Sequence, residues 1–228
     1  MIETVRNAWK VPELRKKIMF TVFALLIFRL GSAVPVPYID STTLETYLAA
    51  QSGTILGLMN AMSGSAFSMA TVFALSIQPY INASIIIQLL TVAIPALERL
   101  AKEGGEEGRK KIAAITRYVT VAIGLLQGFG YYTLIRTQGG GTMLDTAGLP
   151  GWWAGIVIVL CFPAGSAFVM WLGEQINEYG IGNGISLIIF AGIIARLPSA
   201  IQEIWVKLQE GSMSIVTMVV FGVFCIFV

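Results

Sequence analysis

The sequence predicts an all-α, polytopic membrane protein built as a bundle of transmembrane helices. Of its 228 residues, 56% are hydrophobic and 12% are charged, whereas a soluble domain carries about 25% charged residues. Long apolar runs alternate with short charged connections, which is the pattern of several membrane spans. The longest uncharged stretch, 46–97, would measure about 78 Å as one helix, more than twice the ~30 Å hydrocarbon core of a bilayer. This stretch must therefore hold more than one element.

Residue usage argues against an enzyme. The chain has no histidine, which removes Ser-His and Cys-His catalysis and most zinc sites. Cys161 and Cys225 each lie in an apolar run, so we interpret them as small apolar core residues rather than a disulfide. An intramembrane serine protease built on Ser186 is disfavoured because neither histidine nor lysine lies near it. We expect no catalytic residue, no cofactor, no metal and no directly bound nucleic acid.

The chain opens with a basic segment, residues 1–17, followed by an apolar run at 18–30 that we expect to be the first span. A signal peptide with its cleavage site at 31–33 is the alternative. Because Arg29 sits beside that site, we favour a retained span. A polar connection is expected at 38–51.

The amino-acid composition of the uncharged stretch 46–97 changes along its length. Residues 52–68 are rich in glycine and serine, and only 55–62 is apolar enough to form a short helix. Such a segment is tolerated at membrane depth only inside protein or against water, so we expect it to be re-entrant. Residues 69–95 are long enough to cross the membrane. This second piece carries three amides, at Gln78, Asn82 and Gln88. They indicate either helix–helix packing or a water-filled conduit, and the broken segment beside them favours the conduit.

The remaining elements follow in order. They are a charged hairpin at 98–111, a third span at 112–135, a loop at 136–151, and a fourth span from 152 to about 172 that is anchored by Trp152 and Trp153. A turn at 173–179, a fifth span at 181–197 and an interfacial amphipathic helix at 199–210 come next. From 213 to 228 the chain enters a sixth apolar run, whose abrupt end predicts a truncated piece.

Basic residues predict which span ends face the cytoplasm. Residues 1–17 hold five Lys and Arg, residues 98–117 hold six, and the loops on the other side hold three. The positive-inside rule therefore places the N-terminus and the 98–111 hairpin in the cytoplasm. The charge of the hairpin either sets the topology alone or also forms a docking surface for a cytosolic partner.

Four motifs resemble signatures of the SecY family, the channel that passes unfolded polypeptides across or into the membrane. They are FRLGSAVPVPYID after the first span, SIQPYINASIIIQLL in the second, GEEGRKKIAAITRY entering the third and GEQINEYGIGNGISLIIFAGI around the fifth. Their order and spacing extend the resemblance over the whole chain. It implies the N-terminal half of a ten-span channel, with a cytoplasmic segment at 1–17, spans one to five at 18–212 and the start of span six at 213–228. The 18–212 region would include a re-entrant plug helix at about 52–68 and the cytoplasmic loop 98–111.

The resemblance also implies roles for individual residues. The hydrophobic constriction of the pore would consist of Ile77, Ile81, Ile185 and Ile189. The plug would include Ile55, Leu56, Leu58, Met59, Met62 and Phe67, and the lateral gate Asn82, Gln88 and Gln127. Each isoleucine pair has i, i+4 spacing, and a ring of branched aliphatic side chains can seal around a chain while resisting wetting.

By the same resemblance the chain would be the central subunit of the Sec translocation channel in the plasma membrane. Its implied partners are the small subunits SecE and SecG, the motor ATPase SecA, the ribosome, signal sequences, unfolded polypeptides and membrane lipid. The alternative is a small-solute secondary transporter with broken helices. Such a transporter needs a polar or charged site near the midplane, whereas the residues expected there are isoleucines.

Overall fold

Helices make up most of the computed structural model, which describes residues 11–51, 53–138, 143–145, 148 and 150–209. Residues 1–10 of the predicted N-terminal segment, the predicted sixth run at 213–228 and Cys225 lie outside the described residues. In the described part there is no β-strand, only the isolated bridges Pro35↔Thr71 and Ile39↔Leu144. The predicted all-α class is confirmed.

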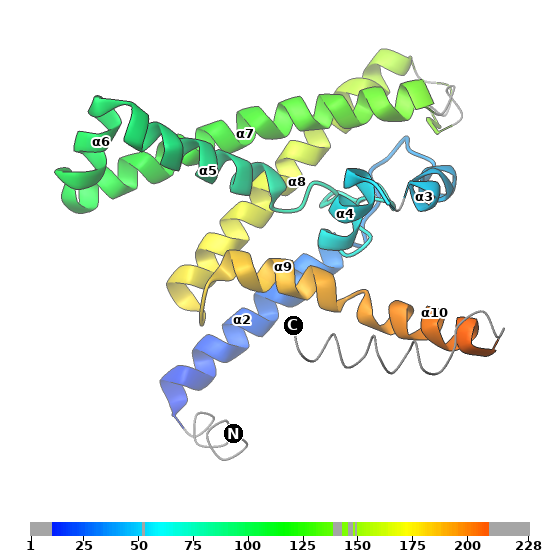
Figure 1. Ribbon diagram of the computed structural model, residues 1–228, viewed down its shortest axis with the longest axis horizontal. Coiled ribbons are helices and arrows are strands. Elements are labelled where there is room, and N and C mark those ends of the chain that lie inside the picture. Colours follow the sequence, from blue (N-terminus) through cyan, green and yellow to red (C-terminus); the bar gives the residue numbers. More distant parts are fainter. Residues whose placement is uncertain (1–10, 52, 139–142, 146–147, 149, 210–228) are drawn as a thin grey trace.

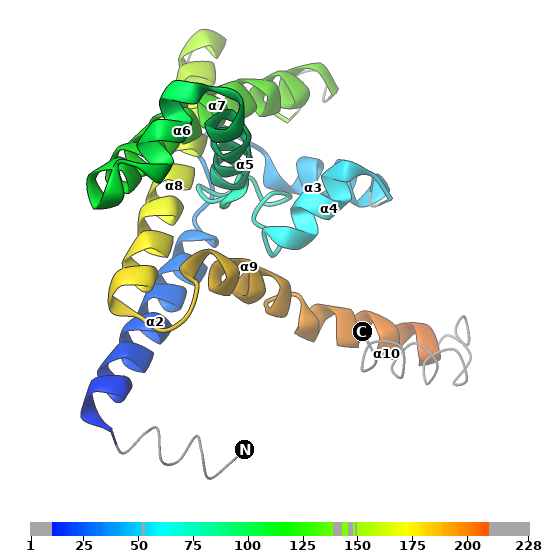
Figure 2. The ribbon, with the colours of Figure 1, turned by 60° about the vertical axis from the view of Figure 1, so that its left-hand side comes forward.

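Nine helices follow one another along the described chain (Figure 1). They are α2 (Pro12–Gly31), α3 (Ser41–Ala50), α4 (Ile55–Met62), α5 (Gln78–Ala93), α6 (Pro95–Lys102), α7 (Gly105–Gln138), α8 (Gly151–Tyr179), α9 (Gly184–Ile194) and α10 (Leu197–Gln209). Helix α8 crosses α7 obliquely and then runs alongside α2 (Figure 1). Helices α5 and α6 also pack on α7, and α4 contacts both α3 and α9 (Figure 2).

The two longest helices, α7 and α8, meet through small residues. A Cβ atom added to Gly128 of α7 would lie 3.2 Å from the Val159 carbonyl oxygen and 3.3 Å from Pro163 Cδ of α8. Gly124, one turn away on α7, likewise faces Pro163. Small residues let helix backbones approach closely, which is the usual source of helix–helix attraction in lipid. Glycines on one helix and a proline on the other thus set how closely the pair approaches.

Two apolar clusters form the interior. The first, which we call the outer cluster, is built on Val36, Leu44, Leu48, Phe67, Ala70, Ala74, Leu75, Tyr131, Ile135, Met143, Ile158 and Phe162. The second, the isoleucine cluster, is built on Ala24, Phe28, Phe73, Ile77, Val169, Leu172, Ile176 and Ile188. The 63–77 stretch contributes residues to both clusters and so connects them.

Only some of the described helices are long and apolar enough to cross a membrane. In the described residues, three helical runs are long and apolar enough to cross a membrane: α7, α8 and Gly184–Gln202, which joins α9 to the start of α10. The pair α5 and α6, bent by 102°, makes a fourth if it is counted as one span. Helix α2 falls outside this group because Arg15, Lys16 and Lys17 near its start and Arg29 near its end leave only residues 18–28 as an uncharged run. A multi-pass membrane protein is confirmed, and five spans remain a prediction.

The turn predicted at 173–179 is wrong. Helix α8 continues through this stretch to Tyr179, and the chain reverses at 180–183 instead. Glu174 lies within α8, and its carboxylate pairs with Arg117 of α7. The reversal needs Gly182, whose φ is +78°, and Asn183, whose side chain caps α9 by accepting from the backbone N–H groups of Ile185 and Ser186.

Two further boundaries differ from the prediction. The stretch 38–51 is not only a connection, since Asp40 caps α3, which buries Leu44 and Leu48 on one face. The span predicted at 69–95 is helical only from Gln78, because the residues before it form turns. Pro79 sits in the first turn of α5, where the missing N–H of proline costs no hydrogen bond.

Candidate functional site

The segment between α4 and α5 is a series of tight turns. The structure has the short helix predicted at 55–62, and it ends before Gly64, whose φ is +66°. Ser65, Ala70 and Ser76 then adopt φ values of 74°, 47° and 49°. Left-handed backbone costs a residue with a Cβ roughly 1–2 kcal/mol, so the surrounding contacts must stabilise this path.

Side chains within the segment satisfy its backbone. The Ser63 hydroxyl accepts a hydrogen bond from the Phe67 N–H at 3.1 Å, and the Asn60 side-chain oxygen accepts from the Ser68 N–H at 3.0 Å. Buried backbone groups without a helical partner need such local acceptors. The serines and Asn60 are therefore explained by turn formation, without contact with a ligand.

Three hydrogen bonds connect the segment to neighbouring helices. The Tyr131 hydroxyl of α7 donates to the Phe67 carbonyl at 2.6 Å. The Ser166 hydroxyl of α8 donates to the Ser76 carbonyl at 2.9 Å. The Gln78 amide of α5 donates to the Met62 sulfur at 3.2 Å, which is a weak bond. Two backbone hydrogen bonds add to these, from the Val36 N–H to the Ala70 carbonyl and from the Val72 N–H to the Val34 carbonyl, both at 2.9 Å.

The segment also lies directly against the backbone of α9. A Cβ atom added to Gly192 would lie 2.5 Å from the Met62 carbonyl oxygen, and one added to Gly64 would lie 2.7 Å from the Gly192 carbonyl oxygen. Both distances are shorter than real Cβ contacts, and both opposing atoms belong to backbone. Only glycine at these two positions permits the observed approach of the end of α4 to α9.

The four predicted constriction residues belong to one cluster. Ile77 is buried in the isoleucine cluster, and Ile81, Ile185 and Ile189 are partly buried against it. Ile77 and Ile185 both reach Gly173 of α8, where an added Cβ would lie 3.6 Å and 3.7 Å from their side chains. The Ile81 N–H bonds to the Ile77 carbonyl at 3.1 Å, so this pair has the expected helical relation. The structure thus brings these residues into one cluster beside Gly173 of α8.

The predicted plug residues divide into two faces. Phe67 is buried, and Leu56 and Met59 pack against the outer cluster. Ile55 and Leu58 point outward, with 77% and 62% of their surface exposed. The helix therefore presents one apolar face to the protein and leaves the other uncovered.

The three predicted gate residues do not come together in the structure. Asn82 is partly buried, and Gln88 is exposed and donates to Ser84 at 3.4 Å. Gln127 instead lines a cavity of about 300 Å³ beside Leu56 and Met59 of α4. Its side-chain oxygen is buried and has no hydrogen-bond partner in the described residues. Gln127 is thus a neighbour of α4, and no hydrogen bond among the described residues joins it to the other two amides.

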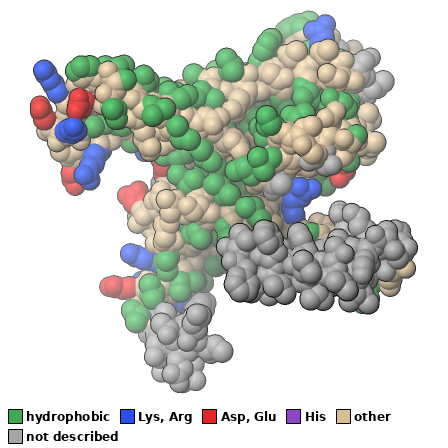
Figure 3. Space-filling view, in the orientation of Figure 1, with side chains coloured by type: hydrophobic (Ala, Val, Ile, Leu, Met, Phe, Trp, Pro, Cys, Tyr) green, Lys and Arg blue, Asp and Glu red, His purple; other side chains and the backbone are tan. Residues whose placement is uncertain are grey.

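One polar contact between spans was missed by the sequence reasoning. Arg117 Nε of α7 lies 2.9 Å from Glu174 Oε1 of α8, although 57 positions separate the two residues. The sequence did contain a signal for this pair. Arg117 lies near the start of the run 112–135, and Glu174, of opposite charge, follows the end of the run 152–172, so both lie on the same side of the membrane if the two runs are consecutive spans. A larger group of charges lies where α6 meets α7 (Figure 3), and there Lys102 Nζ lies 2.7 Å from Glu98 Oε1.

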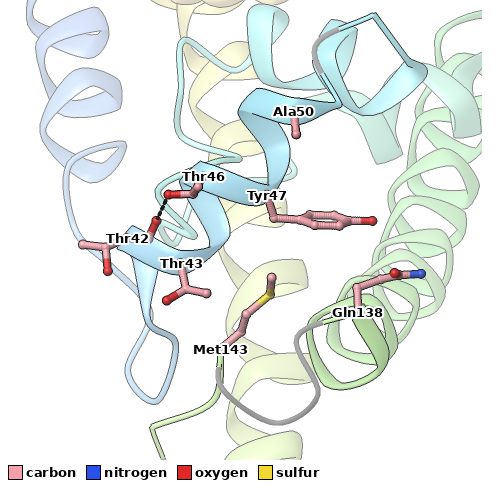
Figure 4. Close-up of a pocket in the computed structure, with 7 residues that line it drawn as sticks. All are labelled: Thr42, Thr43, Thr46, Tyr47, Ala50, Gln138 and Met143. Carbon is pink, nitrogen blue, oxygen red and sulfur yellow. Dashed lines mark hydrogen bonds between the residues drawn. The ribbon is translucent and has the colours of Figure 1, made fainter.

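A second hollow lies beside α3, on the opposite end of α7. Its lining includes Thr42, Thr43, Thr46, Tyr47 and Gln138, whose side chains are drawn in Figure 4. At the start of α3 the hydroxyls of Thr42 and Thr43 donate to the Asp40 carboxylate, which lowers the pKa of Asp40 to about 2. The lining offers hydroxyl and amide groups without a carboxylate or an amine. These groups can form hydrogen bonds with a polar molecule, but the lining has no acidic and basic side chains that could act as general acid and general base.

Metal chemistry has no candidate in the described chain, because no three His, Cys, Asp or Glu side chains gather there as ligands. Cys161 is a free thiol, partly buried on α8 beside the outer cluster.

Comparisons with known proteins point to one family. A family model described as SecY matches residues 71–228. Curated relatives are described as protein translocase subunit SecY. The relative from Buchnera aphidicola subsp. Acyrthosiphon kondoi is 47% identical over 88% of this chain and 56% of its own length. Those from Aquifex aeolicus (strain VF5) and Escherichia coli (strain K12) are 41% and 44% identical, over 96% and 92% of this chain and 51% and 47% of their own lengths. The chain spans about half the length of these relatives.

Solved structures share the fold. One, titled "The structure of a protein conducting channel", matches with a TM-score of 0.54 over 78% of this chain and 36% of its own. Another, titled "Sec61 in the Canine ribosome-channel complex from the endoplasmic reticulum", matches with the same score and coverage. Both are 19% identical to this chain, so this likeness concerns the arrangement of helices alone.

Proposed function

The chain belongs to the SecY family, and on this premise we propose that it forms the N-terminal half of a protein-conducting channel. The channel would pass unfolded polypeptides across the membrane and release membrane segments sideways into lipid. This activity is that of a protein of the relatives' full length, of which the chain covers about half.

One observation carries the proposal: α9 touches both the isoleucine cluster and the end of α4. Ile185 and Ile189 on this helix pack against the cluster that contains Ile77, and Gly192, one turn further on, touches the backbone at Met62. A polypeptide that separated α9 from α5 would therefore also remove the support of the plug. Aliphatic side chains seal such a path without binding any particular sequence, which suits unfolded substrates.

The contacts of α4, Ile55–Met62, support its role as a plug. Ile55 and Leu58 of this helix stay exposed, and a weak hydrogen bond from Gln78 reaches its last residue, Met62. A short helix with one uncovered face opens at lower free energy than the buried turns that follow it, as a plug must. We therefore propose that Ile55, Leu58 and Met62 face the closed pore, while Phe67 serves as the fixed end of the plug.

Two neighbouring isoleucines of α9 provide the decisive experiment. Ile189 is partly buried, whereas Ile188 is fully buried. At a pore constriction the amide of Ile189→Asn would meet water, so the complete protein should still insert and should conduct ions when closed. Ile188→Asn would leave an amide unpaired in the core and should reduce the folded protein instead. Planar-bilayer conductance and membrane yield separate the two outcomes. If Ile189→Asn is as poorly folded as Ile188→Asn and gives no leak, the constriction assignment is wrong.

For the lateral gate we retain Asn82 and Gln88 on α5, and we propose that Gln127 connects the gate to the plug. This assignment is supported by the position of Gln127 beside Leu56 and Met59. The side-chain oxygen of Gln127 has no partner in the described residues, so it can accept a hydrogen bond from a gate helix. Such an interhelical bond contributes only about 0.6–2 kcal/mol, which is weak enough to form and break as the gate moves beside α4.

The remaining family expectations are also proposals. We propose that the channel lies in the plasma membrane. The N-terminus and the 98–111 hairpin would then face the cytoplasm, where the hairpin would contact SecA or the ribosome. SecE and SecG would contact the spans within the membrane. The gathered charges at the α6–α7 end support this orientation (Figure 3).

Labelling of single cysteines tests the orientation. In a variant with Cys161 and Cys225 replaced by alanine, Gly105→Cys and Gly140→Cys should react with a membrane-impermeant reagent from opposite sides. Reaction from the same side would overturn the proposed topology.

A further inference from the structure

A groove lies between the last turns of α7 and the first turns of α8. Two stripes face each other across it. The stripe on α7 consists of Phe129, Tyr132 and Arg136, and the stripe on α8 includes Trp152, Ile156 and Leu160. Their spacings, i, i+3, i+7 and i, i+4, i+8, put each stripe on one helix face. The groove has a volume of about 440 Å³. We propose that it binds one anionic phospholipid, with the phosphate on Arg136 and an acyl chain between the stripes.

The apolar part of the groove is exposed on two helices that can span a membrane. Both helices are long and apolar enough to span, yet Phe129, Ile156 and Leu160 keep 61%, 46% and 56% of their surface exposed. Trp152 and Leu160 are separated by about 12 Å along the helix axis. The groove thus extends from the helix end toward the bilayer interior, as an acyl chain does.

The other end of the groove has the chemistry of a headgroup site. Arg136 lies in the last turn of α7 and is exposed, and none of the residues lining the groove is acidic. A guanidinium group binds phosphate oxygens with two parallel hydrogen bonds. Tyr132 and Trp152 line the same groove and carry a hydroxyl and an indole N–H, and these residue types favour the membrane–water interface.

One glycine gives the groove its shape. Gly155 of α8 is buried under the Tyr132 ring, and an added Cβ would lie 2.8 Å from Tyr132 Cζ and 2.9 Å from its hydroxyl oxygen. Because glycine has no side chain, the tyrosine lies against α8 instead of filling the space between the stripes. Tyr132 and Gly155 together therefore form the floor of the groove.

Arg136 has a simpler explanation, which makes a different prediction. A cation in the last turn of a helix is favoured by the helix dipole alone, and in that case Arg136 would not discriminate between lipids. Arg29 is the matched control, because it is also an exposed arginine in the last turn of a helix, α2, and it does not line the groove.

Native mass spectrometry of the complete, delipidated protein tests the proposal, which is independent of the translocation function. The protein is titrated with phosphatidylglycerol and phosphatidylcholine that carry the same acyl chains. We expect the first phosphatidylglycerol to bind more tightly, and Arg136→Gln to weaken it about fivefold, the contribution of one cationic side chain near an anionic headgroup. Arg29→Gln should leave that affinity unchanged.

A second variant tests the acyl part. Ile156→Trp fills the groove without altering its charge, so it should weaken binding of both lipids. If Arg136→Gln behaves like Arg29→Gln, or if the wild-type protein binds both lipids equally, the anionic site is refuted. If Ile156→Trp changes neither lipid, the acyl chain does not lie between the stripes.

Discussion

The 55–77 segment and the α7–α8 pair meet the same requirement in opposite ways, since both must satisfy backbone polar groups in apolar surroundings. In α7 and α8 the regular helix satisfies them internally, and Gly124, Gly128 and Pro163 let the two helices pack closely. In the segment, short side chains such as Ser63 and Asn60 satisfy the turns one at a time. The first solution needs no other element to complete its backbone hydrogen bonds. The second depends on α7, α8 and α9, so it can be released when one of them moves.

This difference predicts that close packing of the pair is indispensable to the fold. Gly128→Leu would press a branched side chain against the Val159 carbonyl and Pro163, and we expect it to cost roughly 3 kcal/mol and to lower the melting temperature in detergent clearly. Gly130→Leu is the control, because a Cβ at Gly130 meets nothing within 4 Å. Equal stability of the two variants would show that the pair is not held by close packing.

The corresponding change in the segment should act locally. Gly192→Ala places a methyl group against the Met62 carbonyl, and we expect about 1–3 kcal/mol of strain that is relieved by displacing the end of α4. Hydrogen exchange should rise at 55–77 while the melting temperature falls less than in Gly128→Leu. A global loss of stability as large as that of Gly128→Leu would remove the distinction between the two regions.

The hydrogen bond from Tyr131 to the Phe67 carbonyl links the two regions. Tyr131→Phe removes the donor and leaves the Phe67 carbonyl with only the 3.2 Å bond from the Ala70 N–H, which should cost about 0.5–1.5 kcal/mol, the net contribution of one hydrogen bond. Because the acceptor belongs to the segment, we expect faster exchange at 63–77 and little change in α7. Tyr118→Phe, on the same helix but 78% exposed, is the control. Loss of protection along α7 instead would indicate that the tyrosine stabilises its own helix.

Local signals in the sequence predicted the regular parts of the fold. Glycine and serine around 55–62 indicated the short broken helix, and the apolar runs indicated α7 and α8. The sharp bend between α5 and α6 also has a local cause, since Ile94 precedes Pro95 and adopts an extended φ of −108°. Sequence reasoning recognised Pro95 as the end of a span but could not supply the direction of the next helix.

The site was only partly predictable, because its remaining features depend on contacts between distant residues. Family resemblance named the four isoleucines that the structure brings into one cluster, and it named Gln127. Nothing local indicates that Gln127 faces α4, that Gly192 touches Met62, or that the turns at 63–77 need left-handed residues. Glu174 shows the opposite error, in which a charge suggested a loop because its partner, Arg117, is distant in sequence.

The smallest effect we expect concerns that ion pair, which also lies between α7 and α8. The Arg117 and Glu174 side chains keep 54% and 25% of their surface exposed, and exposed pairs contribute only about 0–1 kcal/mol. Arg117→Met retains most of the apolar length and should lower the melting temperature far less than Gly128→Leu. The double variant Arg117→Met, Glu174→Leu should be no less stable than either single variant, because no charge is then left without its partner. If Arg117→Met lowers the melting temperature as much as Gly128→Leu does, the ion pair contributes as much as close packing to the association of α7 and α8. The stability of the pair would then also depend on salt concentration.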